Sequence, residues 1–179
     1  MQTEEIETRF QAIEAVIAQL PEDYQPFGFF LRLSGARTEK SLSLTVGDIE
    51  NAFSDGYKAD LHSKFLVEHL GGALSASAVD YLLKYVVTSR KAILQRLSID
   101  PARAPRQVFI DKNGRPLEGA NVSTAFRNAS ARSGQVPPIG PRDIRQAVVA
   151  AYAAALTDRE LIITLAQSEA DSGAFAEET

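Results

Sequence analysis

Two arginines lie at positions where neighbouring residues restrict the conformation of the backbone. Arg37 follows a Ser-Gly-Ala segment that lies between two apolar runs. Gly35 permits a tight turn there because it has no Cβ, so Arg37 is expected beside the core. Arg145 lies in the stretch RDIRQ, near the start of an alanine-rich helix that Pro141 opens. A planar guanidinium fixed in this way either fills space beside the core or donates paired hydrogen bonds to phosphate oxygens.

Further basic residues concentrate in the second half of the chain. From Lys84 to Arg145 there are twelve Lys or Arg against four Asp or Glu, although the whole chain carries a net charge of −4. This asymmetry can present a basic face to nucleic acid while the ends stay acidic. The alternative is a solvated surface without a partner. The candidate phosphate-binding residues in this stretch are Arg90, Lys91, Arg103, Arg106, Arg142 and Arg145, and the candidates outside it are Arg37, Lys40 and Lys64.

The composition argues against several other kinds of site. There is no cysteine, and His62 and His69 are the only histidines. Their odd separation puts them on opposite faces of a strand, so we expect no metal site and no cofactor. No apolar run approaches the roughly 20 residues of a membrane helix. The acidic, amphipathic start of the chain does not resemble a signal peptide, which favours a cytoplasmic protein.

The elements that position these residues are mostly helices. Apolar residues recur every three or four positions, which predicts helices at 3–20, 27–34, around 42–44, 77–97, 121–133 and 141–155. Asn121 is the predicted N-cap of the fifth helix, and Gly134 is its predicted stop. A capping box at 157–160 predicts a last helix.

Extended segments and turns complete the predicted fold. We expect a turn at 46–48 and a hairpin with arms at 57–61 and 65–70, whose tip carries Lys64. A short extended piece with an Asn113-Gly114 turn follows later. The predicted fold is mainly α with a small antiparallel β element. It forms one domain over 1–168, followed by an acidic tail at 169–179.

Two motifs in this order resemble the catalytic domain of the tyrosine recombinases, the phage integrase family. SGARTEKSLSLTVGDI is similar to the family segment Thr-Gly-Leu-Arg-Ile-Ser-Glu with its following leucines and Asp-Ile, and it places Arg37 on the first active-site arginine. RDIRQ is similar to the family's His-Asp-Leu-Arg-His, and it places Asp143 on the Asp and Arg145 on the second arginine. The resemblance implies a fold that holds a DNA phosphate between two arginines.

In this family a hairpin lysine protonates the leaving oxygen and a tyrosine attacks phosphorus. Lys64 is the expected hairpin lysine, with Lys58 as a rival. The chain departs from the pattern at several positions. Lys40 stands in place of a carboxylate, Arg142 and Gln146 stand in place of histidines, and Gln167 replaces another histidine. The family-equivalent positions are Arg37, Lys64, Arg142, Arg145, Gln167 and Phe175.

The nucleophile is the most informative departure. Phe175 is the aromatic residue nearest the expected tyrosine position, and it has no hydroxyl. Tyr152 lies near Arg145 in the chain, but its alanine-rich helix favours core filling. We therefore expect a pseudoenzyme: a DNA-binding or recombination-accessory protein that has lost strand cleavage and binds weakly through backbone charge.

Two alternatives stay open at this point. One is a protein-interaction module that reuses the recombinase fold, with a protein partner or a second copy bound through the C-terminal tail. The other is an active recombinase whose tyrosine is Tyr152 or comes from another chain.

Overall fold

The computed structural model describes residues 2–53, 65, 67, 70–72 and 76–155. Within these ranges β-pairing consists of two antiparallel bridges, Thr45 with Gln107 and Ile110 with Pro116. The fold is therefore mainly α, as predicted. Its helices are α1 (Gln2–Ala18), α2 (Gln25–Ser34), α3 (Thr38–Ser43), α4 (Val46–Phe53), α6 (Ala76–Tyr85), α7 (Lys91–Arg96), α8 (Gly119–Arg132) and α9 (Pro141–Ala155), with a π-helical turn η2 (Val86–Arg90) and a 3₁₀ turn η3 (Pro101–Arg103).

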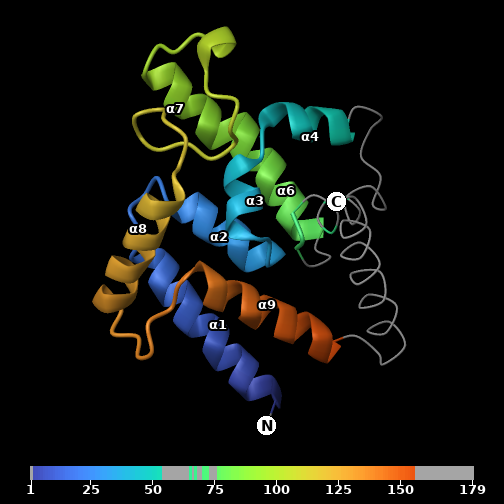
Figure 1. Ribbon diagram of the computed structural model, residues 1–179, viewed down its shortest axis with the longest axis vertical. Helices are drawn as coiled ribbons and strands as arrows, with labels where there is room; N and C mark the ends of the chain where they lie inside the picture. The colour runs from blue at the N-terminus through green and yellow to red at the C-terminus, as the bar shows by residue number, and fades with distance from the viewer. Residues whose placement is uncertain (1, 54–64, 66, 68–69, 73–75, 156–179) are drawn as a thin grey trace, which may run out of the picture.

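The helix α2 lies at the centre of the molecule. α1, α6 and α9 pack around it (Figure 1), and the side chains of Phe27, Phe30 and Leu31 are fully buried. Gly28 allows α1 to approach, since a Cβ at this position would lie only 3.2 Å from Cγ1 of Ile17. The close packing of α9 on α2 is what later brings Arg145 to the site.

An aromatic cluster joins α2 to the segment that follows η3. The ring of Phe109 lies 5.1 Å from Phe27, 5.4 Å from Phe30 and 5.3 Å from Tyr85, measured between centroids. The hydroxyl of Tyr85 also accepts a hydrogen bond from the backbone N–H of Ile110 at 3.4 Å. These contacts fix the 108–110 segment against α2 and α6.

The predicted helix at 77–97 is present, but it includes a π-helical turn. α6, η2 and α7 follow one another without a gap from Ala76 to Arg96. Arg90, at the end of η2, is 7% exposed. Its Nε donates to the carbonyl of Gln107 at 3.3 Å, and its Nη2 donates to the carbonyl of Pro105. The guanidinium therefore holds the connector after η3.

Three glycine positions predicted to end a helix or form a turn are confirmed. α2 ends at Gly35, whose φ is +59°. At the Asn113-Gly114 turn, Oδ1 of Asp111 accepts from the N–H of Asn113 at 2.9 Å, and Gly114 has a φ of +76°. α8 is followed by Gly134 with a φ of +72°. A left-handed glycine at such a position ends a helix without the strain that a Cβ would add.

Three local predictions are wrong. Residues 46–48 form the start of α4 instead of a turn, because Thr45 and Asp48 cap this helix reciprocally. Oδ2 of Asp48 accepts from the N–H of Thr45 at 2.8 Å, and Oγ1 of Thr45 accepts from the N–H of Asp48 at 3.1 Å. α8 begins at Gly119, two positions before the predicted cap, because the carbonyl of Glu118 already accepts from Val122.

The third error concerns the predicted strand at 65–70. The described residues Phe65 and Val67 are π-helical. The N–H of Gly71 donates to the carbonyl of Val67 at 3.1 Å, which is a helical spacing. The other arm at 57–61, the hairpin tip, the last predicted helix and the tail at 169–179 lie outside the described residues. None of the described helices is both long and apolar enough to cross a membrane.

Candidate phosphate-binding site

Backbone hydrogen bonds on both sides hold Arg37 between α2 and α3. Its N–H donates to the carbonyl of Leu70 at 2.9 Å, and its carbonyl accepts from the N–H and the Oγ of Ser41, both at 2.9 Å. The turn before Arg37 is also held by a hydrogen bond, since the buried Oγ of Ser34 accepts from the N–H of Ala36 at 3.1 Å. The backbone of Arg37 is thus fixed while its side chain is exposed.

Arg145 reaches the same place from α9. Its Nη1 donates to the carbonyl of Gly35 at 2.9 Å and to the carbonyl of Gly71 at 2.5 Å. Both acceptors belong to turns, whose carbonyls are not used by a helix. Among the described residues, Nε and Nη2 of Arg145 have no hydrogen-bond partner. One nitrogen therefore anchors the side chain and leaves the rest of the guanidinium available.

Gly71 connects the two arginines. Its φ is +56°, and a Cβ placed on it would lie 3.2 Å from Cζ and Nε of Arg37. The guanidinium of Arg37 therefore lies against Gly71, whose carbonyl accepts from Arg145. Sequence reasoning missed this residue. The Gly-Gly pair at 71–72 was the available signal, because adjacent glycines mark a backbone that other groups approach closely.

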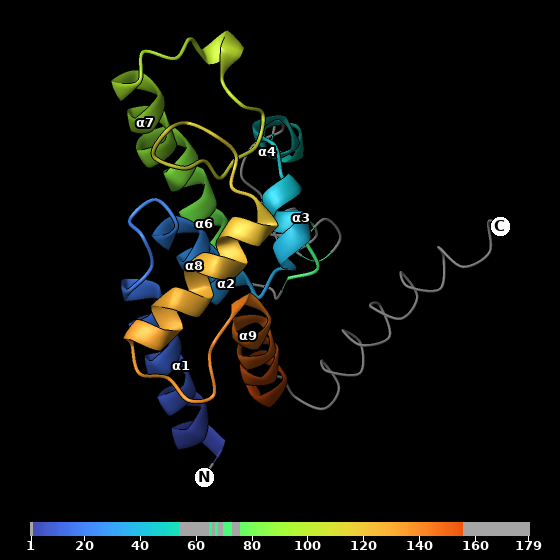
Figure 2. The ribbon, with the colours of Figure 1, turned by 60° about the vertical axis from the view of Figure 1, so that its left-hand side comes forward.

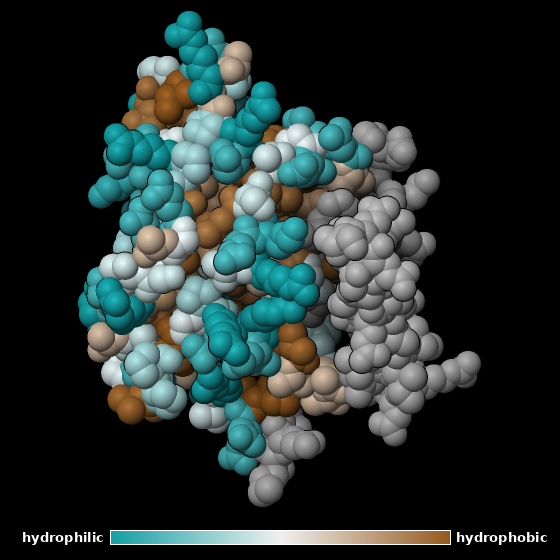
Figure 3. Space-filling view, in the orientation of Figure 1, coloured by the Kyte–Doolittle hydropathy of each residue, from teal (hydrophilic) through white to brown (hydrophobic). Residues whose placement is uncertain are grey.

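A pocket of about 400 Å³ lies between α3 and the first turns of α9. Figure 2 shows α3 beyond the N-terminal end of α9, and Figure 3 shows hydrophilic residues gathered over this part of the surface. The sequence had indicated four of the lining residues as phosphate ligands. The lining consists of Arg37, Thr38, Glu39, Lys40, Pro141, Arg142 and Arg145.

The pocket is strongly cationic. Four of its side chains are basic and one, Glu39, is acidic. None of the ion pairs found among the described residues involves the four cations. Burial lowers the pKa of Arg145 from its ordinary value, and the positive charge of Arg37 lowers it further. An arginine nevertheless stays protonated in proteins, so the two guanidinium groups repel each other across the pocket.

Four further predicted phosphate ligands, Arg90, Lys91, Arg103 and Arg106, do not line this pocket. Arg90 is buried, and its guanidinium is bound to backbone carbonyls, so we assign it a structural role. Lys91, Arg103 and Arg106 are exposed and do not line the pocket. Lys58, Lys64, Gln167 and Phe175 lie outside the described residues.

Three of the described tyrosines, Tyr24, Tyr81 and Tyr85, have raised pKa values. Burial raises the pKa of Tyr81 to about 12, and burial also raises the pKa values of Tyr24 and Tyr85. A raised pKa disfavours the phenolate that attacks phosphorus. Tyr152 packs against the core and does not line the pocket.

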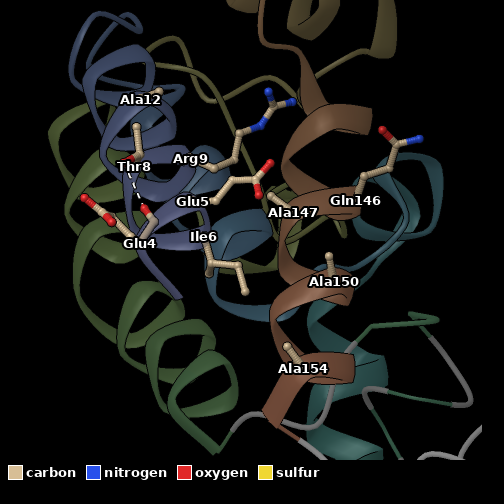
Figure 4. A pocket seen from close by; sticks show the side chains of 10 residues that line it. All are labelled: Glu4, Glu5, Ile6, Thr8, Arg9, Ala12, Gln146, Ala147, Ala150 and Ala154. Atoms are coloured by element: carbon tan, nitrogen blue, oxygen red, sulfur yellow. Dashed lines mark hydrogen bonds between the residues drawn. The ribbon is translucent and has the colours of Figure 1, made fainter. Parts of the chain in front are cut away.

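A larger hollow of about 950 Å³ lies between α1 and α9, away from the paired arginines. Ile6 of α1 and the alanines of α9 line it and are called its apolar floor below, and Figure 4 shows Glu4 and Glu5 beside Ile6 on α1. Arg9, at the same place, pairs with Asp143 at 3.8 Å. With its acidic side chains and apolar floor, this hollow does not suit a phosphate.

The described residues contain no group of three or more His, Cys, Asp or Glu that could hold a metal ion. No protein-family model matches this chain, and no curated protein or solved structure matches it either.

Proposed function

We propose that this protein is an integrase-like DNA-binding or recombination-accessory protein that holds a DNA phosphate without cleaving the strand. The observation that carries the proposal is the position of Arg37 and Arg145 in one pocket, although they lie far apart in the chain. These are the two residues that the motif resemblance aligned with the arginines of the tyrosine recombinases. Paired guanidinium groups suit the non-bridging oxygens of a phosphodiester.

The residues around the pocket support binding more than chemistry. Lys40 and Arg142 add positive charge at positions where the resembling family has a carboxylate and a histidine. A lone pocket of this kind contributes a few backbone contacts and no reading of base edges. Binding should therefore be weak, insensitive to sequence and steeply dependent on salt.

Titration of a labelled duplex of about 30 base pairs at about 50 and 200 mM salt tests the proposal. Arg142→Ala removes a cation whose side chain has no partner among the described residues, so the fold should survive. We expect a several-fold loss of affinity and a salt slope that is smaller by about one. Arg115→Ala, an exposed arginine outside the pocket, is the matched control. Equal binding by both variants, or no binding at about 50 mM salt, would contradict the proposal.

The absence of cleavage needs a separate experiment. A nicked suicide duplex traps any covalent phosphotyrosine link as a species that survives denaturing gels. We expect no adduct from the full chain. An adduct that disappears in Tyr152→Phe would instead support an active recombinase, and an adduct that persists in that variant would indicate another tyrosine.

The second candidate is a protein-interaction module, and the hollow between α1 and α9 favours it. Its apolar floor and the carboxylates of Glu4 and Glu5 suit an apolar partner segment with basic residues beside it. Ala150→Glu would place a charge on that floor. Loss of a protein complex in Ala150→Glu, with DNA binding unchanged, would favour the protein-interaction module over the DNA-binding protein.

A further inference from the structure

We infer that the pocket between α3 and α9 selects a terminal phosphate monoester, as found at a DNA end or nick, over an internal phosphodiester. This inference rests on the proposed function, because both use the same pocket. It adds the chemical class of the phosphate that the pocket holds.

The pocket is rich in positive charge. Among the described residues, four cationic side chains and one carboxylate, Glu39, line it, and none of the four cations has an ion-pair partner there. A phosphodiester brings one negative charge, whereas a phosphate monoester brings about 1.5 to 2 at neutral pH. The more highly charged ligand offsets more of the repulsion that Arg37 exerts on Arg145.

The cations lie on two walls of the pocket. Arg37 and Lys40 come from the α3 side, and Arg142 and Arg145 come from α9. A monoester presents three terminal oxygens and continues into the nucleic acid at one point only. It can therefore receive donors from both walls, whereas a diester has two non-bridging oxygens and needs room for strand on both sides.

Lys40 is the residue that distinguishes the two ligands. It lies in α3, which Arg37 precedes as the N-cap residue, and both side chains line the pocket. Its side chain is exposed, so a substitution should leave the core intact. Replacing it by glutamate reverses the charge on one wall and leaves both arginines in place.

The experiment compares one duplex in three forms, with 5′-phosphate, 3′-phosphate or hydroxyl ends, at constant ionic strength and pH 8. We expect a phosphorylated form to bind about tenfold more tightly than the hydroxyl form, because the additional charge and third terminal oxygen of the monoester add about one charge-assisted hydrogen bond. At pH 5 the preference should shrink toward parity, since the second pKa of the monoester is near 6. Inorganic phosphate should compete with the phosphorylated end.

Two variants assign the preference to this pocket. Lys40→Glu should abolish it, whereas Lys112→Glu, the same change at an exposed lysine outside the pocket, should keep it. Circular dichroism confirms that both variants are folded.

The outcomes separate the two proposals. Equal affinity for all three duplex forms, with a loss of affinity in Arg142→Ala, would overturn this inference and leave the proposed function standing. A preference that persists in Lys40→Glu would also overturn it. No binding to any form at about 50 mM salt would overturn both proposals. Binding of inorganic phosphate alone, without a preference among DNA ends, would assign the pocket to free phosphate and overturn the assignment to DNA ends.

Discussion

The guanidinium of Arg145 divides its donors between the fold and the pocket. Nη1 bonds the carbonyls of Gly35 and Gly71, while Nε and Nη2 have no hydrogen-bond partner among the described residues. Only a planar group with several donors at fixed angles can do both, and a lysine at this position would not replace it. The position of Arg145 therefore depends on two glycines whose carbonyls it reaches.

Gly71→Ala tests this dependence. Alanine at a φ of +56° is strained, and its Cβ would lie 3.2 Å from the guanidinium of Arg37. We expect the free energy of unfolding to fall by about 1 kcal/mol and DNA affinity to fall severalfold, measured by urea unfolding and duplex titration.

Gly134→Ala is the matched control for that substitution. Its φ is +72°, but a Cβ there would meet nothing within 4 Å, so it carries the backbone strain without the contact. It should lose a similar free energy of unfolding and keep full DNA affinity. The same affinity loss in both variants would show that Gly71 does not position Arg37.

Tyr81 predicts how stability changes at alkaline pH. Burial raises its folded pKa to about 12 from the ordinary 10, so between these values the folded state holds a proton that the unfolded chain releases. Stability contributed by the neutral phenol is fully present below pH 10 and is lost as the pH rises through 12. Urea unfolding from pH 9 to 11 should show a falling free energy. A smaller fall in Tyr81→Phe confirms the origin, and an unchanged slope in that variant would contradict it.

At the scale of elements, short polar contacts fix how the helices connect. Thr45 and Asp48 cap α4, and Arg90 ties η2 to the connector at 105–107. Because the chain pairs Thr45 with Gln107, the contact of Arg90 also supports the region where α3 passes into α4. One buried arginine thus links η2, the connector at 105–107 and the junction of α3 with α4.

Arg90→Met keeps the length of the side chain and removes its donors. The carbonyls of Pro105 and Gln107 then lose their partner, and we expect the free energy of unfolding to fall by about 2–3 kcal/mol. Arg103→Met, an exposed control, should change it by less than about 0.5 kcal/mol. Chemical unfolding monitored by circular dichroism measures both. If Arg90→Met stays as stable as the control, the buried contact is not structural.

At the scale of the whole molecule, the pocket brings cationic side chains together, and the ion pairs among the described residues do not offset their mutual repulsion. α3 and α9 hold four cations around one small volume with one carboxylate. A bound anion relieves this repulsion only in the folded state, because the unfolded chain separates the charges. Ligand binding should therefore appear as stability of the whole domain.

Thermal unfolding in inorganic phosphate measures that coupling. At about five times its Kd, phosphate should add about 1 kcal/mol, which raises Tm by about 2–4 °C for a chain of this size. Sodium chloride at equal ionic strength should not raise Tm in the same way. Lys40→Glu should abolish the phosphate effect, and an equal rise in that variant would place the anion elsewhere.

Local sequence patterns predicted local structure well. The apolar spacing of the first helix and the glycines at 35, 114 and 134 depend on neighbours within a few positions, and the structure confirms them. The errors arose where distant contacts decide. Phe65 and Val67 have residue types that suit a strand, yet they are helical, because tertiary contacts outweigh strand propensity.

The sequence by itself determined which side chains carry charge, where most helices run and that both arginines follow restricted turns or helix starts. It could not distinguish Arg90, which is buried and bound to carbonyls, from Arg142, which lines the pocket. Arg90 is occupied because its guanidinium reaches the carbonyls of Pro105 and Gln107. The pocket forms because α9 packs against α2, which brings Arg145 to the carbonyls of Gly35 and Gly71. Charge is a property of each residue, whereas convergence of charges depends on contacts between segments far apart in the chain, and only the tertiary structure makes those contacts.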